Sequence, residues 1–193
     1  MQAGTGVPVT QGNEWNSYAG GGYKLSVPER FLADDSSGHA AMVNWDLPPA
    51  TVDAIIRQST SVQAVVNEKR LWINTAASTG KKVPEVIYFA VNKLPNNVSS
   101  KWILDTWTAL YSDPGWKMVI SSQNHKLVKL PSGWAVQWRI LGTWDKTHRL
   151  GFMEYDIAKG DKLYALGLYA PAQKLPGLTH EFGKIAASIK LKG

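Results

Sequence analysis

Hydrophobic and polar positions alternate with a period of two over much of the second half of this chain. On the segment after residue 133, every second residue is hydrophobic: Trp134, Val136, Trp138 and Ile140. Successive side chains of a strand point to opposite faces, so this spacing predicts a strand with one apolar face. The segments 130–133 and 158–161 contain Pro or Gly and predict tight turns. The pattern indicates an antiparallel meander of four strands over residues 116–169.

Three further strands are predicted in the first half. Residues 23–28 (YKLSVP) alternate in polarity and end in proline, which is typical of a short strand followed by a bend. Residues 39–45 (HAAMVNW) form a second candidate. Residues 83–91 (VPEVIYFAV) are almost continuously apolar, and such a run predicts a central strand that is buried on both faces.

Three helices are predicted from spacings of three and four. Hydrophobic residues follow this spacing through most of residues 49–77, and a second helix runs from a cap at Ser99 or Ser100 to about residue 111. The closing helix carries hydrophobic residues at i, i+4, i+7 and i+11 over residues 178–189, with Thr179 as its expected N-cap. Helices packed on an antiparallel sheet define an α+β domain.

The domain is expected to span residues 23–193, as a single unit with one core. Residues 1–22 are rich in Gly, Thr, Gln and Asn and show no periodicity, so they are predicted to be a flexible tether. The tether resembles the start of a mature bacterial lipoprotein in which Met1 stands in place of a lipid-bearing cysteine. On this hypothesis a lipid that the sequence does not carry would tether the protein to a membrane.

Three segments together resemble the PsbP-like fold: YKLSVPERF at the start, KLYALGLYAP before the closing helix, and HEFGKIAASIKL at the end. An extrinsic subunit of photosystem II, a nuclear import factor that binds the Ran GTPase, and many bacterial envelope lipoproteins share that fold. The resemblance covers most of residues 23–191 and implies an α/β/α sandwich. The helical stretch predicted at 49–77 departs from the family pattern. Because most members are adaptors or extrinsic subunits, the resemblance also implies a role without catalysis.

The net charge of +6 is unevenly distributed. Residues 1–60 contain three Lys or Arg and six Asp or Glu, whereas the rest of the chain contains eighteen and nine. A basic body can attract nucleic acid, anionic lipid or an acidic protein. The lysines are scattered as singles and pairs, a pattern typical of a solvated surface, and we expect no nucleic-acid partner.

No metal or cofactor is expected. The chain has no cysteine, which excludes disulfides and thiolate chemistry. Its four histidines include no pair at i, i+3 or i+4, and Asp34 and Asp35 lie in a Ser- and Gly-rich segment typical of a turn. There is no G-x-S-x-G motif, so a hydrolase would need residues that converge only in the folded chain.

The tryptophans are the best functional signal among the 193 residues. Trp134 and Trp138 share a face with hydrophobic residues and are predicted to be core. Trp144 lies at a strand end, and His148 and Arg149 follow in the predicted turn. An exposed aromatic residue near Arg139 and Arg149 is typical of a protein contact, so the predicted partner-binding residues are Arg139, Trp144, His148 and Arg149.

The leading hypothesis is a non-enzymatic protein of the bacterial envelope, periplasmic or tethered to the outer membrane, that binds another protein as an assembly or accessory factor. Three alternatives stay open. One is a cytoplasmic chaperone of secreted effectors, and another is a small-ligand or lipid-binding module whose tryptophans line a cavity. The third is a hydrolase whose site is not visible in the sequence. Neither the partner's identity nor the oligomeric state follows from the sequence.

Overall fold

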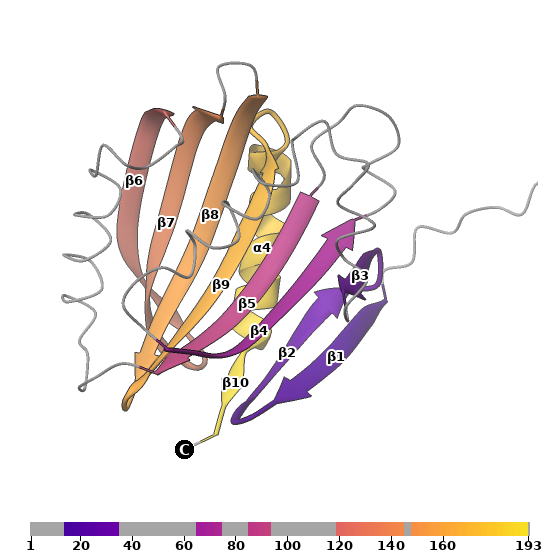
Figure 1. Cartoon of the computed structure of the whole chain (residues 1–193), viewed down its shortest axis with the longest axis vertical. Coiled ribbons are helices and arrows are strands. Elements are labelled where there is room, and N and C mark those ends of the chain that lie inside the picture. The colour runs from indigo at the N-terminus through magenta and orange to yellow at the C-terminus, as the bar shows by residue number, and fades with distance from the viewer. Residues whose placement is uncertain (1–13, 35–64, 75–84, 94–118, 145–147, 193) are drawn as a thin grey trace, which may run out of the picture.

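Two antiparallel sheets and a helix make up the described part of the chain, which in this computed structural model comprises residues 14–34, 65–74, 85–93, 119–144 and 148–192. The smaller sheet has the order β1-β2-β10, and its strands are β1 (Trp15–Gly20), β2 (Tyr23–Pro28) and β10 (Lys190–Leu191). Figure 1 shows it beside the β3–β4 end of the larger sheet. The predicted first strand over residues 23–28 is confirmed as β2.

The larger sheet has the order β3-β4-β5-β9-β8-β7-β6. Its strands are β3 (Phe31–Asp34), β4 (Val65–Asn74), β5 (Glu85–Lys93), β6 (Val119–Leu130), β7 (Gly133–Trp144), β8 (His148–Lys159) and β9 (Lys162–Pro171). The predicted meander is confirmed as β6 to β9. Gly133 and Gly160, in its two predicted turns, have φ values of 139° and 62°, which glycine adopts without steric cost. The predicted central strand is confirmed as β5, which is buried except for Lys93.

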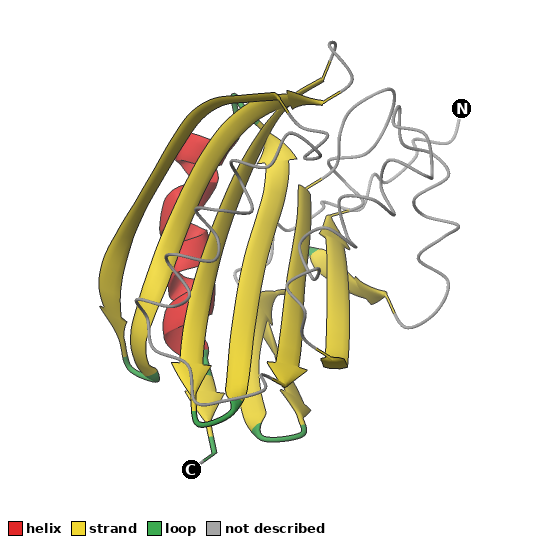
Figure 2. Cartoon of the chain, turned by 60° about the vertical axis from the view of Figure 1, so that its left-hand side comes forward, coloured by secondary structure: helices red, strands yellow, loops and turns green. Residues whose placement is uncertain are grey.

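Helix α4 (Leu175–Ser188) packs on one face of the larger sheet, which we call the helix-side face (Figure 2). Phe182 and Ile185 of α4 belong to a core that also contains side chains of β2 and every second residue of the central strands. That core includes Tyr23, Leu25, Trp72, Ile87, Phe89, Met153, Tyr155 and Leu166. The small sheet and α4 therefore cover the same face, as an α+β fold requires.

The start of α4 differs from the expectation that Thr179 caps it. The helix begins at Leu175, four residues earlier, with Pro176 in its first turn. Proline fits this position because the first turn leaves its backbone N–H groups without intrahelical partners. Thr179 instead donates a hydrogen bond from Oγ1 to the carbonyl oxygen of Leu175 at 2.9 Å. The prolyl-glycyl pair thus belongs to the helix and does not precede it.

Two other expectations are wrong within the described residues. Residues 65–74, predicted as helix, form β4, because pairing with both β3 and β5 outweighs an ambiguous local spacing. Trp15–Gly20, assigned to the tether, form β1, which pairs along its whole length with β2 and packs Tyr18 on Trp72 at 5.1 Å between ring centroids. The predicted strand at 39–45 and the predicted helix at 99–111 lie outside the described residues, as do residues 1–13.

The opposite face of the larger sheet carries a row of polar and aromatic residues in register. Trp138 of β7 pairs with Glu154 of β8, which pairs with Gly167 of β9, which in turn pairs with Tyr88 of β5. The side chains of Trp138 and Glu154 are fully buried, and so is Asp156, two residues further along β8. This face therefore buries two neighbouring carboxyl groups in the middle of the sheet.

Candidate functional site

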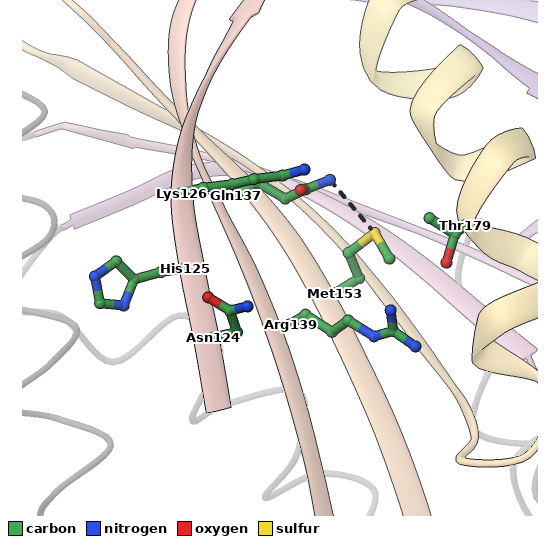
Figure 3. A pocket seen from close by; sticks show the side chains of 7 residues that line it. All are labelled: Asn124, His125, Lys126, Gln137, Arg139, Met153 and Thr179. Atoms are coloured by element: carbon green, nitrogen blue, oxygen red, sulfur yellow. Dashed lines mark hydrogen bonds between the residues drawn. The ribbon is translucent and has the colours of Figure 1, made fainter. Parts of the chain in front are cut away.

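A pocket of about 200 Å³ opens on the helix-side face between the edge of the larger sheet and α4 (Figure 3). Two adjacent strands supply its polar side chains, because Asn124 pairs with Arg139 and Lys126 pairs with Gln137. Met153 of β8 and Thr179 of α4 complete it, with His125 at its rim. We call this the basic pocket, and its residues are Asn124, Lys126, Gln137, Arg139, Met153 and Thr179.

Hydrogen bonds to the core hold the floor of the basic pocket. Gln137 donates from Nε2 to the hydroxyl oxygen of Tyr155 at 2.5 Å, and the same nitrogen lies 3.8 Å from the sulfur of Met153. Tyr155 packs on Phe182 of α4, with 5.4 Å between ring centroids. Burial raises the pKa of Tyr155 above its usual value, and the hydrogen bond from Gln137 opposes that rise. The neutral phenol of Tyr155 therefore holds the side-chain amide of Gln137 in place.

The charged residues of the basic pocket have one sign. Lys126 and Arg139 are exposed, and among the described residues neither forms an ion pair. No carboxylate is found among the described residues that line the pocket. The one acidic residue of α4, Glu181, is bound by two hydrogen bonds from the guanidinium of Arg30. A planar guanidinium and an ammonium beside two amides are suited to bind a carboxylate or a phosphate.

The opposite side of the same hairpin carries an exposed apolar patch. Leu127 is 57% exposed and Trp134 is 55% exposed, and Lys129 lies between them with Nζ 5.1 Å from the centre of the Trp134 ring. His125 packs on the buried Trp138 at 4.9 Å between ring centroids, and Figure 3 shows it pointing away from the basic pocket. We call His125, Leu127, Lys129 and Trp134 the hairpin patch.

The prediction that Trp134 and Trp138 are both core is half confirmed. Trp138 is fully buried, as predicted, and the shared face of Val136, Trp138 and Ile140 is confirmed. The prediction for Trp134 is wrong, because this residue lies at the turn end of β7, opposite Lys129 of the edge strand. The alternation in sequence gives the face correctly, whereas exposure depends on the position along the strand.

The four predicted partner-binding residues lie on one hairpin but at different positions. Arg139 lies in the basic pocket, on the opposite face from Trp138, as expected. Arg149 is exposed and pairs with Thr143. It lies four residues along β8 from Met153 of the basic pocket, which is about 13 Å along the strand. Trp144 ends β7 opposite His148, so His148 and Arg149 begin β8 and do not lie in the turn. The side chains of Trp144 and His148 lie outside the described residues, and the binding role of this set stays a prediction.

Sequence reasoning missed Asn124, Lys126 and Gln137 as site residues. A signal existed for Gln137. It alternates with the apolar residues of the strand, as Arg139 does, so both are predicted on the polar face. Asn124 and Lys126 come beside them only through the register of β6 on β7, which is unbroken from the turn at Leu130 and Gly133 to Ser122.

Within the described part of the chain, no three His, Cys, Asp or Glu side chains come together in a way that could hold a metal ion. No described helix combines the length and the apolar character needed to cross a membrane.

Comparisons with known proteins return no match to a family model and no match to a curated protein. Solved structures give three likenesses. Cyanobacterial PsbP (CyanoP) from Synechocystis sp. PCC 6803 has a TM-score of 0.48 and 11% identity over 99% of this chain and 97% of that chain. The Ran-binding protein Mog1p of Saccharomyces cerevisiae has a TM-score of 0.49 and 9% identity over 94% of this chain and 96% of that chain. LpqN, involved in cell envelope biogenesis of Mycobacterium tuberculosis, has a TM-score of 0.49 and 15% identity over 93% of this chain and 91% of that chain.

These likenesses are of the kind that the sequence resemblance predicts, since PsbP and a Ran-binding protein are among them. With TM-scores of 0.48 and 0.49 and 9 to 15% identity, no property of these proteins is transferred to this chain. The described residues have an α+β architecture, with antiparallel sheets and a helix at the C-terminal end.

Proposed function

We propose that this chain is a non-enzymatic protein-binding factor, and that its partner docks along β6. The observation that carries the proposal is the exposure of this strand. β6 is twelve residues long, lies at the end of the larger sheet in strand order, and is exposed at nine of its twelve positions. Among the described residues, it pairs with β7 alone.

A long exposed edge strand is costly for a protein that has no use for it. Edge strands present unpaired backbone groups that can join another chain, and proteins usually shorten, cover or charge such edges. β6 is long. Lys126, Lys129 and a bulge between Ile120 and Ser122 charge and twist this edge, but the hairpin patch still leaves Leu127 and Trp134 in solvent. Extended peptides that add to a sheet edge gain affinity from backbone hydrogen bonds and specificity from alternate side chains. β6 and its flanking side chains offer both.

The basic pocket favours binding of a protein over the two other classes considered. Pockets for small ligands usually enclose about 300 to 1,000 Å³ and are mostly apolar, whereas this one holds about 200 Å³ and is lined mainly by polar side chains. A hydrolytic site needs a base beside a nucleophile, and His125 points away from the pocket (Figure 3). The envelope location and the lipid tether rest on residues 1–22 and stay predictions.

Site-specific crosslinking in the cells that make this protein tests the proposal. A photoreactive phenylalanine analogue is placed at Leu127 on β6 and, as the control, at Lys24, an exposed position on β2 of the small sheet. We expect a discrete crosslinked protein from position 127 and none from position 24. Products of equal yield at both positions, or none at position 127, would contradict docking on β6.

A further inference from the structure

We infer that the segment docked on β6 is an extended acidic strand, with carboxylates at alternate positions in the basic pocket and apolar side chains on the hairpin patch. The inference rests on the proposed function and names the chemistry of the partner. Two observations carry it: β6 has a different character on each of its faces, and the two cations of the pocket have no acidic partner among the described residues.

The first observation concerns the helix-side face of β6. Lys126 of β6 is directly opposite Gln137 of β7, and Arg139 of β7 is directly opposite Asn124 of β6. Lys126 and Arg139 are therefore diagonal neighbours. Diagonal neighbours lie about 7 to 8 Å apart. The nearby Glu181 is already bound by Arg30. Two exposed cations in a partly enclosed pocket therefore attract an acidic group from outside the described residues.

The second observation concerns the other face of the same strand. Leu127 and the ring of Trp134 are exposed there, and Lys129 lies over that ring. Burial of exposed apolar surface stabilises a complex by about 25 cal/mol per Å² before the costs of association are subtracted. A partner that covers this patch must present apolar or aromatic side chains to it.

Strand geometry joins the two observations into one pattern. A strand added to β6 would lie about 4.8 Å from it, and its side chains would alternate between the two faces. Residues beside Asn124 and Lys126 would be two apart and would face the basic pocket. The residue between them would lie beside His125, and the residue after them would lie beside Leu127, both on the hairpin patch. Arg139 lies one strand further in, at about 10 Å from the added backbone, a gap that an arginine and an acidic side chain span together. The predicted pattern is acidic, apolar, acidic, apolar.

The same geometry favours a polypeptide over the other polyanions. A lipid headgroup or a nucleic-acid phosphate could reach Lys126 and Arg139, but neither can pair with the backbone of an edge strand. Nucleic-acid surfaces also need a continuous basic stripe, whereas the polar side of the pocket is completed by two amides and a hydroxyl. Charge and backbone pairing together select an acidic peptide.

Binding of designed peptides to the full chain tests the inference. The probe is a labelled ten-residue peptide that alternates Glu with Val and carries one Tyr, measured by fluorescence anisotropy at low and at physiological salt. Two comparison peptides have the same length: one has Lys in place of every Glu, and the other has the same composition with all Glu residues in one block. We expect the alternating acidic peptide to bind at least tenfold more tightly than either.

Two double variants of equal charge change locate the site. Lys126→Gln with Arg139→Gln removes the cations of the basic pocket and should weaken binding of the acidic peptide at least tenfold. Lys24→Gln with Lys190→Gln removes two exposed cations that face each other in the small sheet, and should change it less than twofold. The charge-reversed pair Lys126→Glu with Arg139→Glu should bind the lysine peptide instead, which keeps the test decisive if the neutral variant folds poorly.

The outcomes separate this inference from the proposed function. Equal effects of the two double variants, or equal binding of the blocked and alternating peptides, would overturn the acidic strand. Tighter binding to vesicles of phosphatidylglycerol or to a single-stranded oligonucleotide than to the peptide would overturn it also. If the crosslink at position 127 persists in Lys126→Gln with Arg139→Gln, docking on β6 stands while the acidic pattern fails. If that crosslink never forms, the proposed function fails first.

Discussion

On the helix-side face of β7, Arg139 is exposed and faces the solvent of the basic pocket, whereas on the opposite face of β8, one strand away, Glu154 and Asp156 are fully buried. Both sets belong to one hairpin, in which Trp138 pairs with Glu154 and Arg139 pairs with Met153. The cations are accessible to another protein, whereas the two carboxyl groups are enclosed by the fold. Charge on this hairpin thus divides by face: one face is suited to binding, and the other bears a cost in stability.

That cost has an identifiable physical origin. A buried carboxyl group favours its neutral form, because the low-dielectric interior solvates the ion poorly. Burial raises the pKa of Glu154 well above its usual value, and the charge of Asp156 and a hydrogen bond to Asp156 raise it further. The exposed cations of the other face bear no such penalty, because water solvates them. The comparison predicts that changes at the buried positions of the opposite face alter stability, and that changes at exposed positions alter binding.

The largest expected effect separates Trp138 from Trp134, both on β7. Trp138→Ala empties a fully buried site and should lower the free energy of unfolding by about 3 to 5 kcal/mol. Trp134→Ala removes a half-exposed ring at the turn and should change it by no more than about 0.5 kcal/mol. Urea denaturation followed by fluorescence measures both variants. Equal losses would break the distinction between the buried and exposed positions of the strand.

The next effect concerns the middle of the buried row. Gly167 lies between Glu154 and Tyr88 in the sheet, and a Cβ there would overlap the Tyr88 ring. Gly167→Ala should therefore destabilise the fold by about 1 to 3 kcal/mol, the usual range for overpacking. The loss should shrink in a Tyr88→Leu background, because the overlapping ring is gone.

Gly177→Ala is the matched control for that experiment. A Cβ at Gly177, in the first turns of α4, meets nothing within 4 Å. Alanine is the better helix former, so this variant should be neutral or gain up to about 1 kcal/mol. If Gly167→Ala were as well tolerated as Gly177→Ala, the close packing of Tyr88 on β9 would be refuted.

Periodicity predicted the parts of the fold in which burial and local pattern coincide. β2, β5, the meander and the buried side of α4 each carry apolar residues at the spacing of their own secondary structure. β1 is nearly all exposed, so its sequence has no apolar phase, and its place comes from pairing with β2. β4 has an ambiguous spacing that its two neighbouring strands resolve.

The candidate site was predictable only where a single strand specifies it. Arg139 could be assigned to the face opposite Trp138, because the two are adjacent in one alternating strand. Lys126 could not be joined to Arg139 without the register across the turn between β6 and β7. Glu154 and Asp156 were missed for another reason. Almost all of β8 is buried on both faces, so alternation in polarity does not reveal where its charged residues lie.

The most specific effect is the pH dependence caused by Glu154. Its pKa is raised in the folded chain, so between the unfolded pKa and the folded pKa the folded state binds more protons than the unfolded state. Stability is therefore greatest below the unfolded pKa, near 4.3, and falls as pH rises through the window up to the folded pKa. The slope reaches at most about 1.4 kcal/mol per pH unit for one proton. Glu154→Gln, which stays neutral, should be free of this loss.

Urea denaturation of the parent chain and Glu154→Gln at pH 4 to 8 measures that difference. The variant should gain stability relative to the parent as pH rises, because at position 154 only the parent must either keep a proton or bury a charge. Glu29→Gln is the control, since Glu29 is exposed and its replacement removes no buried charge. A parent-minus-variant difference that stays flat with pH would mean that the ionised carboxylate is solvated or paired in the fold. The opposite face would then bear no electrostatic cost, and the contrast between the two faces would reduce to exposure alone.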